Sequence, residues 1–202
     1  MKEIIINKAM NRVKKNSNYT EEKLAEIKYG LSTLYINITK TIVIFTLAYF
    51  LGIIKELLLI LLFYGFLRLT GFGLHAKKSW QCWIGSLFTF LLLPFLVKVL
   101  SINVYVRLII SFISIIYIAI YAPADTEKRP LIRKKRRIIY KIICTITAIV
   151  LTIYSFYAKN TLIQNAIFFS LILECIMISP LTYKIFKLKY ANYKNYKKPL
   201  PA

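Results

Sequence analysis

Residues 103–122, NVYVRLIISFISIIYIAIYA, contain one charged side chain, that of Arg107. An α-helix rises about 1.5 Å per residue, so a helix of about 20 residues spans about 30 Å, the thickness of the hydrocarbon core of a bilayer. Hydrophobic residues make up 58% of the 202-residue chain, and they recur in other runs of similar length. The sequence therefore predicts an all-α, polytopic integral membrane protein.

On both sides of this segment we predict further spans, giving about six transmembrane helices in a membrane domain at 31–181. Gly52 and the charged Lys55 and Glu56 separate the first two spans, which should form a tight hairpin. Pro94 should kink the third span because proline removes a backbone donor. The expected spans are 31–51, 53–69, 82–100, 103–122, 138–158 and 161–181.

Two segments flank this membrane domain. Within residues 1–30, an apolar stripe runs from Ile5 to Val13 with charged residues on the other faces, a pattern typical of helices that lie in the membrane interface. A second helix should begin at Glu21, because acidic residues stabilise the positive end of a helix. The tail at 182–202 places aromatic residues among lysines, which predicts a surface helix on anionic lipid headgroups.

The charge distribution predicts the orientation. Lys and Arg number 29 against 8 Asp and Glu, for a net charge of +21. Such an excess would favour a nucleic-acid partner in a soluble protein, but here the charges lie between apolar runs and no recognised nucleic-acid-binding fold accompanies them. With the N-terminus in the cytosol, 24 Lys and Arg fall on the cytosolic side and 4 on the other. Because basic residues resist translocation, we expect both termini to be cytosolic.

Residues 68–86, RLTGFGLHAKKSWQCWIGS, bring a histidine and a cysteine close together in sequence, between the second and third spans. His75 is the single histidine of the chain, and Cys82 follows seven residues later. An imidazole can take the proton of a thiol and so produce a nucleophilic thiolate. On one continuous helix the two Cα atoms would be about 10.5 Å apart, too far for direct proton transfer. A catalytic pair therefore requires a bend, which Gly71 and Gly73 would permit.

Simpler interpretations of these residues exist. A cysteine near a helix start is often a small packing residue, and a lone interfacial histidine is often a polar surface group. Cys82, Cys144 and Cys175 are too widely separated to form a disulfide framework or a metal-binding motif. Zinc needs three or four ligands, and only His75, Cys82 and Asp125 come into consideration. We therefore predict neither a metal nor a cofactor.

The pattern Gly-x-His-Ala-x5-Cys, formed by Gly73, His75, Ala76 and Cys82, resembles the AgrB family, the membrane peptidases of accessory gene regulator quorum sensing. A second block, YAPADTEKRP at 121–130, resembles the family's Ala-Pro-x-x-Thr-x-x-x-Pro segment. Chain length, number of spans and the basic tail agree as well. The resemblance therefore covers essentially the whole chain.

This resemblance implies a cysteine endopeptidase of the cytoplasmic membrane, with Cys82 as the nucleophile and His75 as its general base, both facing the cytosol. The substrate would be a short AgrD-like precursor peptide with an amphipathic leader, a central signal segment and an acidic C-terminal tail. Cleavage would remove the tail and leave a thioester on Cys82. A nucleophile within the peptide, usually a cysteine, would then close a cyclic thiolactone. The family also implies a homodimer.

The other candidate residues have alternative roles. Arg68 is either a site residue, as the resemblance implies, or a helix-end side chain that snorkels to the interface. Asp125 and Thr126 form either a turn or cap, or a wall of the active site that orients His75. Glu174, inside the sixth span, is either functional, paired with Lys40, or directed at another subunit. The candidates for substrate binding or support are Arg68, Gly73, Lys77, Lys78, Ser86, Asp125 and Thr126.

A protein of a different class is compatible with the same spans. In a non-catalytic peptide exporter or membrane scaffold, His75 and Cys82 would be packing residues. We favour the enzyme, because two blocks that resemble one family occur in the expected order. Substitution of Cys82 by alanine separates the two interpretations.

Overall fold

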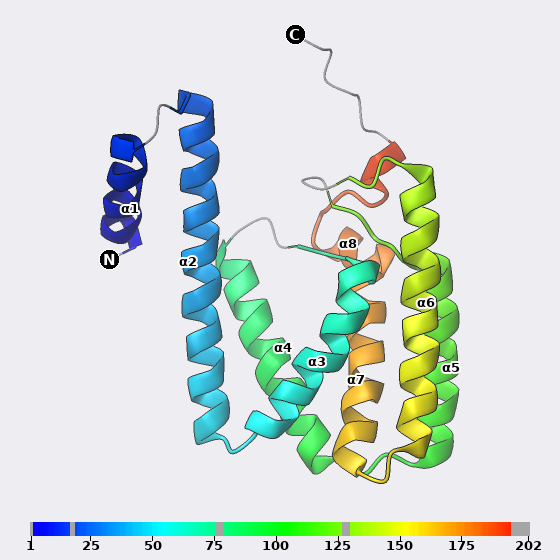
Figure 1. Ribbon diagram of the computed structural model, residues 1–202. Coiled ribbons are helices and arrows are strands. Elements are labelled where there is room, and N and C mark those ends of the chain that lie inside the picture. The colour runs from blue at the N-terminus through cyan, green and yellow to red at the C-terminus, as the bar shows by residue number, and fades with distance from the viewer. Residues whose placement is uncertain (1, 17–18, 76–78, 127–129, 195–202) are drawn as a thin grey trace. The chain divides into compact units, whose positions relative to one another are not determined.

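The computed structural model describes residues 2–16, 19–75, 79–126 and 130–194. Every regular element in these ranges is helical, which confirms the all-α prediction (Figure 1). The chain divides into two compact units, residues 1–50 and 51–202. The first holds α1 (Lys2–Asn16) and α2 (Glu21–Phe50). The second holds α3 (Ile54–Gly71), α4 (Ser79–Val99), α5 (Val104–Tyr121), α6 (Lys134–Tyr157), α7 (Thr161–Ile178), α8 (Pro180–Ile185) and the short η1 (Asn192–Lys194).

The first unit contains the expected amphipathic helix. Ile6 and Met10, one turn apart on α1, are 2% and 6% exposed, whereas the neighbouring Ile4 and Ile5 remain exposed. α2 begins at Glu21, as predicted, after Thr20 accepts a hydrogen bond from the backbone N–H of Lys23 at 3.4 Å. The structure differs from the prediction in one respect. The helix expected to begin at Glu21 and the span expected at 31–51 form one continuous helix of 30 residues.

Six helices, α2 to α7, coincide with the six predicted spans. Of the described helices, five are long and apolar enough to cross a membrane, namely α2, α4, α5, α6 and α7. The exception is α3, whose 18 residues include Lys55, Glu56 and Arg68. Charged side chains are costly in hydrocarbon and persist where protein surrounds them. Consistent with this, Leu57, Ile60 and Leu67 of α3 are fully buried.

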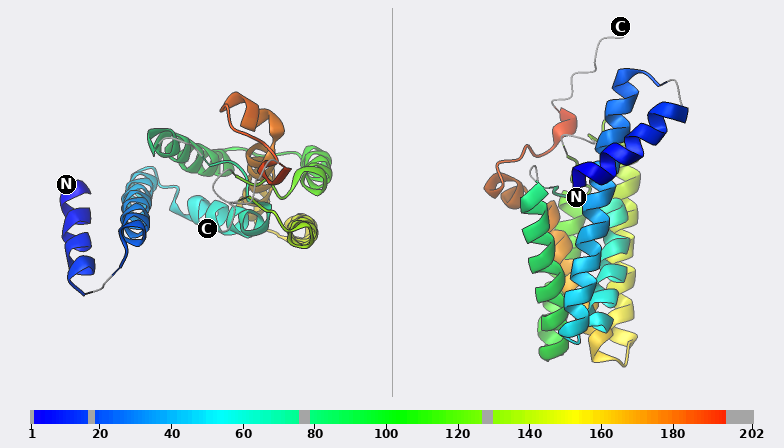
Figure 2. Two further views of the ribbon diagram at one scale, coloured as in Figure 1. Left: turned by 90° about the horizontal axis from the view of Figure 1, so that it is seen from above. Right: turned by 90° about the vertical axis from the view of Figure 1, so that its left-hand side faces the viewer.

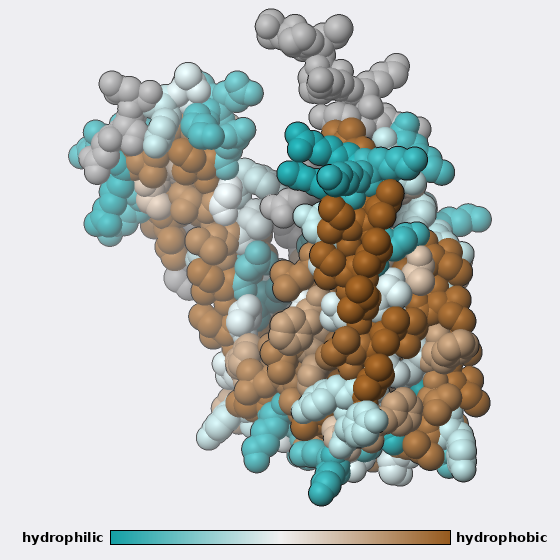
Figure 3. All heavy atoms as spheres, turned by 45° about the vertical axis from the view of Figure 1, so that its right-hand side comes forward, coloured by the Kyte–Doolittle hydropathy of each residue, from teal (hydrophilic) through white to brown (hydrophobic). Residues whose placement is uncertain are grey.

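Within the second unit, α7 is the central helix. It packs against α3, α4, α5 and α6, as the view from above shows (Figure 2). Ile167, Leu171 and Ile178 of α7 are at most 1% exposed. In contrast, apolar residues on the outer helices, such as Phe112 and Ile146, are 61% and 53% exposed. Figure 3 shows these outer surfaces as an apolar band between polar ends, the surface that a polytopic membrane protein presents to lipid.

Amide side chains of α7 hold together the end of this unit where α7 begins. Asn165 donates to the carbonyl oxygens of Val97 at 3.1 Å and Leu100 at 2.7 Å, at the end of α4. Gln164 donates to the carbonyl oxygen of Ala158, which follows α6, at 2.6 Å. Helix C-termini leave carbonyl groups without intrahelical partners, so these contacts satisfy them. The His75 segment lies at the opposite end, where α3 finishes and α4 begins.

The described part of the tail differs from the predicted surface helix. It contains the six-residue α8 and then irregular chain, in which Lys187 and Ala191 have positive φ angles of 53° and 54°. Tyr183 is 1% exposed, and its ring packs edge-on against Tyr190 at a centroid distance of 5.2 Å. The aromatic side chains are therefore used to fold the tail onto the protein, and they do not line one helix. Residues 195–202 lie outside the described ranges.

Candidate functional site

The segment between α3 and α4 bends as the sequence requires. α3 ends at Gly71, and the next two residues, Phe72 and Gly73, have φ angles of 59° and 94°. Such positive φ angles reverse the chain direction and are readily adopted by glycine. His75 therefore lies beyond the end of α3, whereas Cys82 lies in the first turns of α4. The predicted bend is confirmed, and the two residues are not on one continuous helix.

Backbone hydrogen bonds fix this segment against the loop that follows α5. The N–H of Gly73 donates to the carbonyl oxygen of Ala124 at 2.8 Å, and the N–H of Ala124 donates to that of Gly71 at 3.0 Å. Phe72 and Ala124 consequently form an isolated parallel β-bridge. The two sequence blocks singled out above therefore meet in space.

Leu74, the residue before His75, is held through both of its backbone polar groups. Its N–H donates to the carbonyl oxygen of Met177, near the end of α7, at 2.9 Å. Its carbonyl oxygen accepts a hydrogen bond from Nη2 of Arg68 at 2.8 Å. Because the Leu74 side chain is also buried, at 7% exposure, the chain is anchored at this point. His75 follows as an exposed side chain on a fixed backbone.

Close packing explains both glycines in this segment. A Cβ atom at Gly71 would collide with the Glu174 carboxylate and would lie 3.1 Å from Sγ of Cys144. A Cβ atom at Gly73 would collide with Nη1 of Arg68 and lie 2.7 Å from the Met177 carbonyl oxygen. Gly73 thus adopts a positive φ angle and leaves space for the Arg68 guanidinium. Its role in this structure is therefore to support the segment before His75.

Cys82 lies at the positive end of α4. The helix begins at Ser79, and its first turn contains no acidic residue. Backbone N–H groups without intrahelical partners and the helix dipole give such an end a positive potential. The side chain is half-buried and is not part of a disulfide. Ser86 is also half-buried and lies four residues further on, so it shares a helix face with Cys82.

Asp125 forms the centre of a second hydrogen-bond cluster and is 3% exposed. Its Oδ1 accepts the backbone N–H of Asn192 at 2.8 Å. Its Oδ2 accepts the backbone N–H groups of Tyr193 at 2.8 Å and Leu131 at 3.2 Å. These bonds tie the tail and the start of the next loop to the Ala124 region. The predicted turn or cap role therefore describes this carboxylate well, and Thr126 beside it is half-buried.

Two tyrosines, the buried Tyr183 and the half-buried Tyr190, close the same cluster. Tyr183 donates from its hydroxyl to the carbonyl oxygen of Asp125 at 3.0 Å, and Tyr190 donates to that of Tyr121 at 3.3 Å. Burial raises the pKa of Tyr183 well above its usual range and the pKa of Tyr190 to about 12. Both phenols therefore stay protonated and act as hydrogen-bond donors at physiological pH.

A basic cavity of about 260 Å³ opens between the end of α5, the start of α6 and the tail. Lys134, Arg137 and Lys141 line it from one face of α6. The Arg137 guanidinium lies 3.5 Å from the centre of the Tyr193 ring, and Lys141 donates to the carbonyl oxygen of Ile120 at 2.9 Å. Asp125 also lines the cavity, but the three basic side chains outnumber this one acid, and the first turn of α6 contains no acid, so the lining carries a net positive charge at the positive end of a helix.

The remaining predicted residues are distributed as follows. Arg68 and Gly73 adjoin the His75 segment, whereas Lys77 and Lys78 lie outside the described residues. Across the described ranges, no three His, Cys, Asp or Glu side chains gather as a metal site would need. Sequence reasoning missed Met177 and Ala124, which act through backbone atoms and so carry no side-chain signal.

Comparison with known proteins identifies the family. Residues 6–178 match the family model described as accessory gene regulator B. The chain belongs to the accessory gene regulator B (AgrB) family. Membership gives it a role in accessory gene regulator quorum-sensing signal processing, and it confirms the resemblance seen in the two sequence blocks.

Individual relatives agree with this assignment. An AgrB-like protein of Clostridium acetobutylicum is 35% identical over 178 residues, which cover 88% of this chain and 85% of the relative. An AgrB-like protein of Listeria monocytogenes is 32% identical over 87% of this chain and 86% of its own length. The accessory gene regulator protein B of Staphylococcus aureus is 33% identical over 70% of this chain and 76% of its own length. No solved structure matches the chain.

Proposed function

We propose that the chain is a cysteine endopeptidase of the cytoplasmic membrane that matures a quorum-sensing precursor peptide. Cys82 is the nucleophile and His75 is the general base. The observation that carries this proposal is the anchored backbone at Leu74. This residue directly precedes His75 and lies three residues beyond the end of α3, and Cys82 lies in the first turns of the next helix, α4. Family membership supplies the substrate class, an AgrD-like peptide.

The reaction uses only groups of the chain and of the peptide. His75 takes the proton of Cys82, and the thiolate attacks the scissile carbonyl carbon. The C–N bond breaks, the imidazolium returns the proton to the departing amine, and the acidic tail leaves. The signal segment is then joined to Cys82 as a thioester. A cysteine thiol inside the peptide attacks this thioester, closes the thiolactone and releases the enzyme thiol.

The position of the site favours ring closure over hydrolysis. Exchange of one thioester for another keeps the activated bond, whereas water would destroy it. Cys82 is half-buried in the first turns of α4, where neighbouring side chains restrict solvent. A site at the membrane edge that limits water therefore directs the acyl-enzyme to the thiol of the peptide.

The basic cavity suits the acidic tail of the precursor. Lys134, Arg137 and Lys141 face this cavity, and their charge would attract carboxylates and raise the encounter rate. The cavity adjoins Ala124, which is bonded to Gly73 in the His75 segment. The exposed apolar side chains of Ile4 and Ile5 on α1 offer a matching interfacial surface for the amphipathic leader and for anionic lipids.

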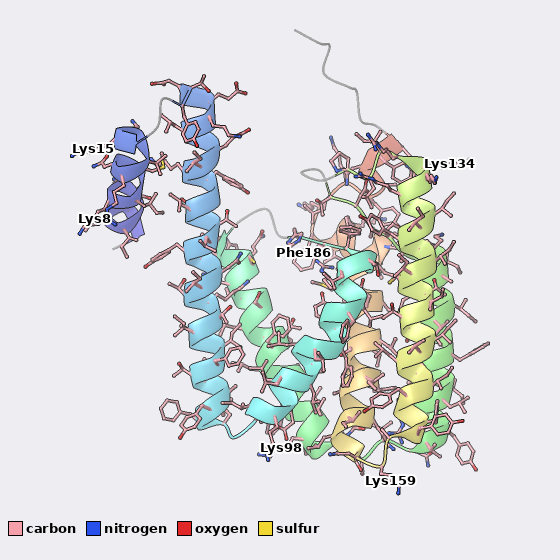
Figure 4. All side chains as sticks on the ribbon, in the orientation of Figure 1. Lys8, Lys15, Lys98, Lys134, Lys159 and Phe186 are labelled. Carbon is pink, nitrogen blue, oxygen red and sulfur yellow. The ribbon has the colours of Figure 1, made fainter. Side chains whose placement is uncertain are left out.

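The distribution of basic residues supports a cytosolic location for this chemistry. Lys134 lies at the end of the second unit where α6 begins, whereas Lys98 and Lys159 lie at the opposite end (Figure 4). The basic end, with the His75 segment, faces the cytosol in this proposal, and the sparsely charged end faces outward. We also propose that the protein forms a homodimer, because the resemblance to the AgrB family implies one.

Substitution of the nucleophile tests the function. Full-length protein in membrane vesicles is incubated with a precursor that has an internal cysteine and an acidic tail. Cys82→Ala and His75→Ala should abolish tail removal, and intact mass should show peptide joined through Cys82 only in protein with both residues. Cys175→Ala, on α7, is the matched control and should keep activity. Full processing by membrane-inserted Cys82→Ala would instead favour a non-catalytic exporter or scaffold.

A further inference from the structure

The core of the second unit contains polar side chains that the proposed chemistry does not use. Around the C-terminal turn of α3, several buried polar atoms have no hydrogen-bond partner. They are Nη1 of Arg68, Oγ1 of Thr70, Oγ of Ser170 and both carboxylate oxygens of Glu174. Buried polar atoms are nearly always paired, because each unpaired one costs about 1–3 kcal/mol. A group of them therefore calls for a functional explanation.

Glu174 is the most unusual member of this group. Its side chain is 0% exposed, and its carboxylate packs against Gly71, the last residue of α3. Two other acids are buried among the described residues, Glu56 and Asp125. Glu56 lies in the first turn of α3, at the other end of that helix, and Asp125 is saturated with backbone N–H groups. Glu174 is thus the buried acid that is left without a hydrogen-bond donor.

Arg68 lies on the other side of the same short segment. Its Nη2 donates to the Leu74 carbonyl oxygen at 2.8 Å, and its Nη1 packs against Gly73. The guanidinium therefore touches the two residues immediately before His75. The Glu174 carboxylate lies at Gly71 and the Arg68 guanidinium at Gly73, with no direct hydrogen bond from Nη1 to the carboxylate, so their opposite charges act on each other across this short segment. Such an interaction is strong where the surroundings have a low dielectric constant.

We propose that Glu174 is a positioning residue, whose buried carboxylate keeps the Arg68 guanidinium in the orientation that holds the Leu74 carbonyl and thereby His75. This inference rests on the proposed function, because it assigns Glu174 a part in presenting the general base. The guanidinium and the carboxylate carry opposite charges, and both have buried atoms without a hydrogen-bond partner. Both lie close to a helix C-terminus, Arg68 three residues before the end of α3 and Glu174 four residues before the end of α7.

The physical consequence concerns the orientation of one peptide group. A second hydrogen bond anchors Leu74, from its N–H to the carbonyl oxygen of Met177. It joins backbone atoms only, so it does not depend on the Glu174 carboxylate. Removal of the negative charge leaves the guanidinium without its counter-charge, and it then turns toward solvent to be hydrated. The Leu74 carbonyl loses its donor, and the imidazole is displaced while the fold stays intact. A displacement of about 1 Å at a catalytic group lowers rates by about 100-fold.

The test measures the reactivity of Cys82 directly. In full-length protein with Cys144→Ala and Cys175→Ala, iodoacetamide alkylation of Cys82 is followed by intact mass from pH 5 to 9. His75→Ala provides the rate and pH profile of a thiol without its base. Glu174→Gln, which keeps shape and removes charge, should alkylate about 10-fold more slowly than the parent with the pH profile of His75→Ala. Arg68→Gln with Glu174→Gln should be no slower than either alone.

Matched variants separate positioning from stability. Ser170→Ala removes an unpartnered buried hydroxyl one turn away on the same helix and should keep the parental rate. Glu174→Asp retains the charge and should alkylate faster than Glu174→Gln. If Glu174→Gln does not accumulate in membranes, the Gly71→Ala variant replaces it in the test. The added Cβ atom of residue 71 displaces the Glu174 carboxylate without removing its charge. This variant should show the same slow rate, and a parental rate would overturn the proposal.

The outcomes also distinguish this inference from the proposed function. The Glu174→Gln variant could alkylate at the parental rate while Cys82→Ala fails to process the precursor. That pair of results overturns the positioning role alone. Precursor processing by Cys82→Ala overturns the enzyme proposal. A slow Glu174→Gln variant whose melting temperature in detergent equals that of the parent supports positioning, since a purely structural role would lower both together.

Discussion

Gly73 donates its backbone N–H to the carbonyl oxygen of Ala124, 51 residues further along the chain, at 2.8 Å. This bond and its counterpart from Ala124 to Gly71 join the His75 segment to the loop after α5. The same loop carries Asp125, which holds the tail. One continuous hydrogen-bonded network therefore connects three segments that are far apart in sequence.

Gly73→Ala should lower processing activity about 100-fold and the free energy of unfolding by about 1–3 kcal/mol. The substitution places a Cβ atom at a φ of 94° and against Arg68 and the Met177 carbonyl. Gly65→Ala, inside α3 and with no other atom within 4 Å of the added Cβ, is the control and should keep activity. Precursor cleavage and melting temperature in detergent report the result. Equal activity of the two variants would contradict the close-packing argument.

Asp125→Ala should release the tail from the protein. Three backbone N–H groups lose a charged acceptor, which should cost about 3 kcal/mol or more in the folded state. Limited proteolysis should then cut between α8 and η1 faster than in the parent. Lys194→Ala, an exposed position in the same region, serves as the control. An unchanged cleavage rate in Asp125→Ala would show that the aromatic contacts alone retain the tail.

Lys134→Gln should raise the KM for a precursor with an acidic tail about twofold to fivefold and leave kcat unchanged. Lys134 lines the basic cavity, whereas its neighbour Lys135 does not. Lys135→Gln makes the same change of net charge and should leave KM close to the parental value. The salt dependence of kcat/KM should weaken in the first variant only. Identical effects in both variants would indicate long-range attraction without a specific cavity.

The orientation can be tested by labelling at the two ends of α6. In protein whose native cysteines are replaced, a membrane-impermeant maleimide should label Lys159→Cys in intact cells. Lys134→Cys should react only after the membrane is permeabilised, because the basic end faces the cytosol in our proposal. Figure 4 shows Lys134 at the start of α6 and Lys159 just beyond its other end. The reverse labelling pattern would place the His75 segment outside the cell and refute the proposed topology.

The helices were predictable because their signal is local. Length and hydropathy located six helices that coincide with α2 to α7, and the pair of glycines indicated the bend before α4. The start of the first span was less accurate. α2 begins at Glu21 because no proline interrupts the polar residues that precede the apolar run, and helix formation continues through them.

The contacts that hold the candidate site were not predictable from one sequence. Met177 and Ala124 contribute carbonyl oxygens, which every residue has, so neither position stands out. The lysine and tyrosine spacing of the tail suggested a helix, but tertiary contacts with Asp125 and Tyr190 decided its conformation. The sequence shows Glu174 as an acid within an apolar segment, yet Gly71, against which its carboxylate packs, belongs to a helix more than 100 residues earlier.

The bond from Leu74 to Met177 imposes an order on biosynthesis. A nascent chain that has inserted α3 and α4 already carries His75 and Cys82, but it lacks the acceptor that the last turn of α7 supplies. The carboxylate of Asp125 likewise waits for the amides of residues 192 and 193. The contacts that hold the candidate site are therefore completed only after the chain as far as residue 193 has left the ribosome.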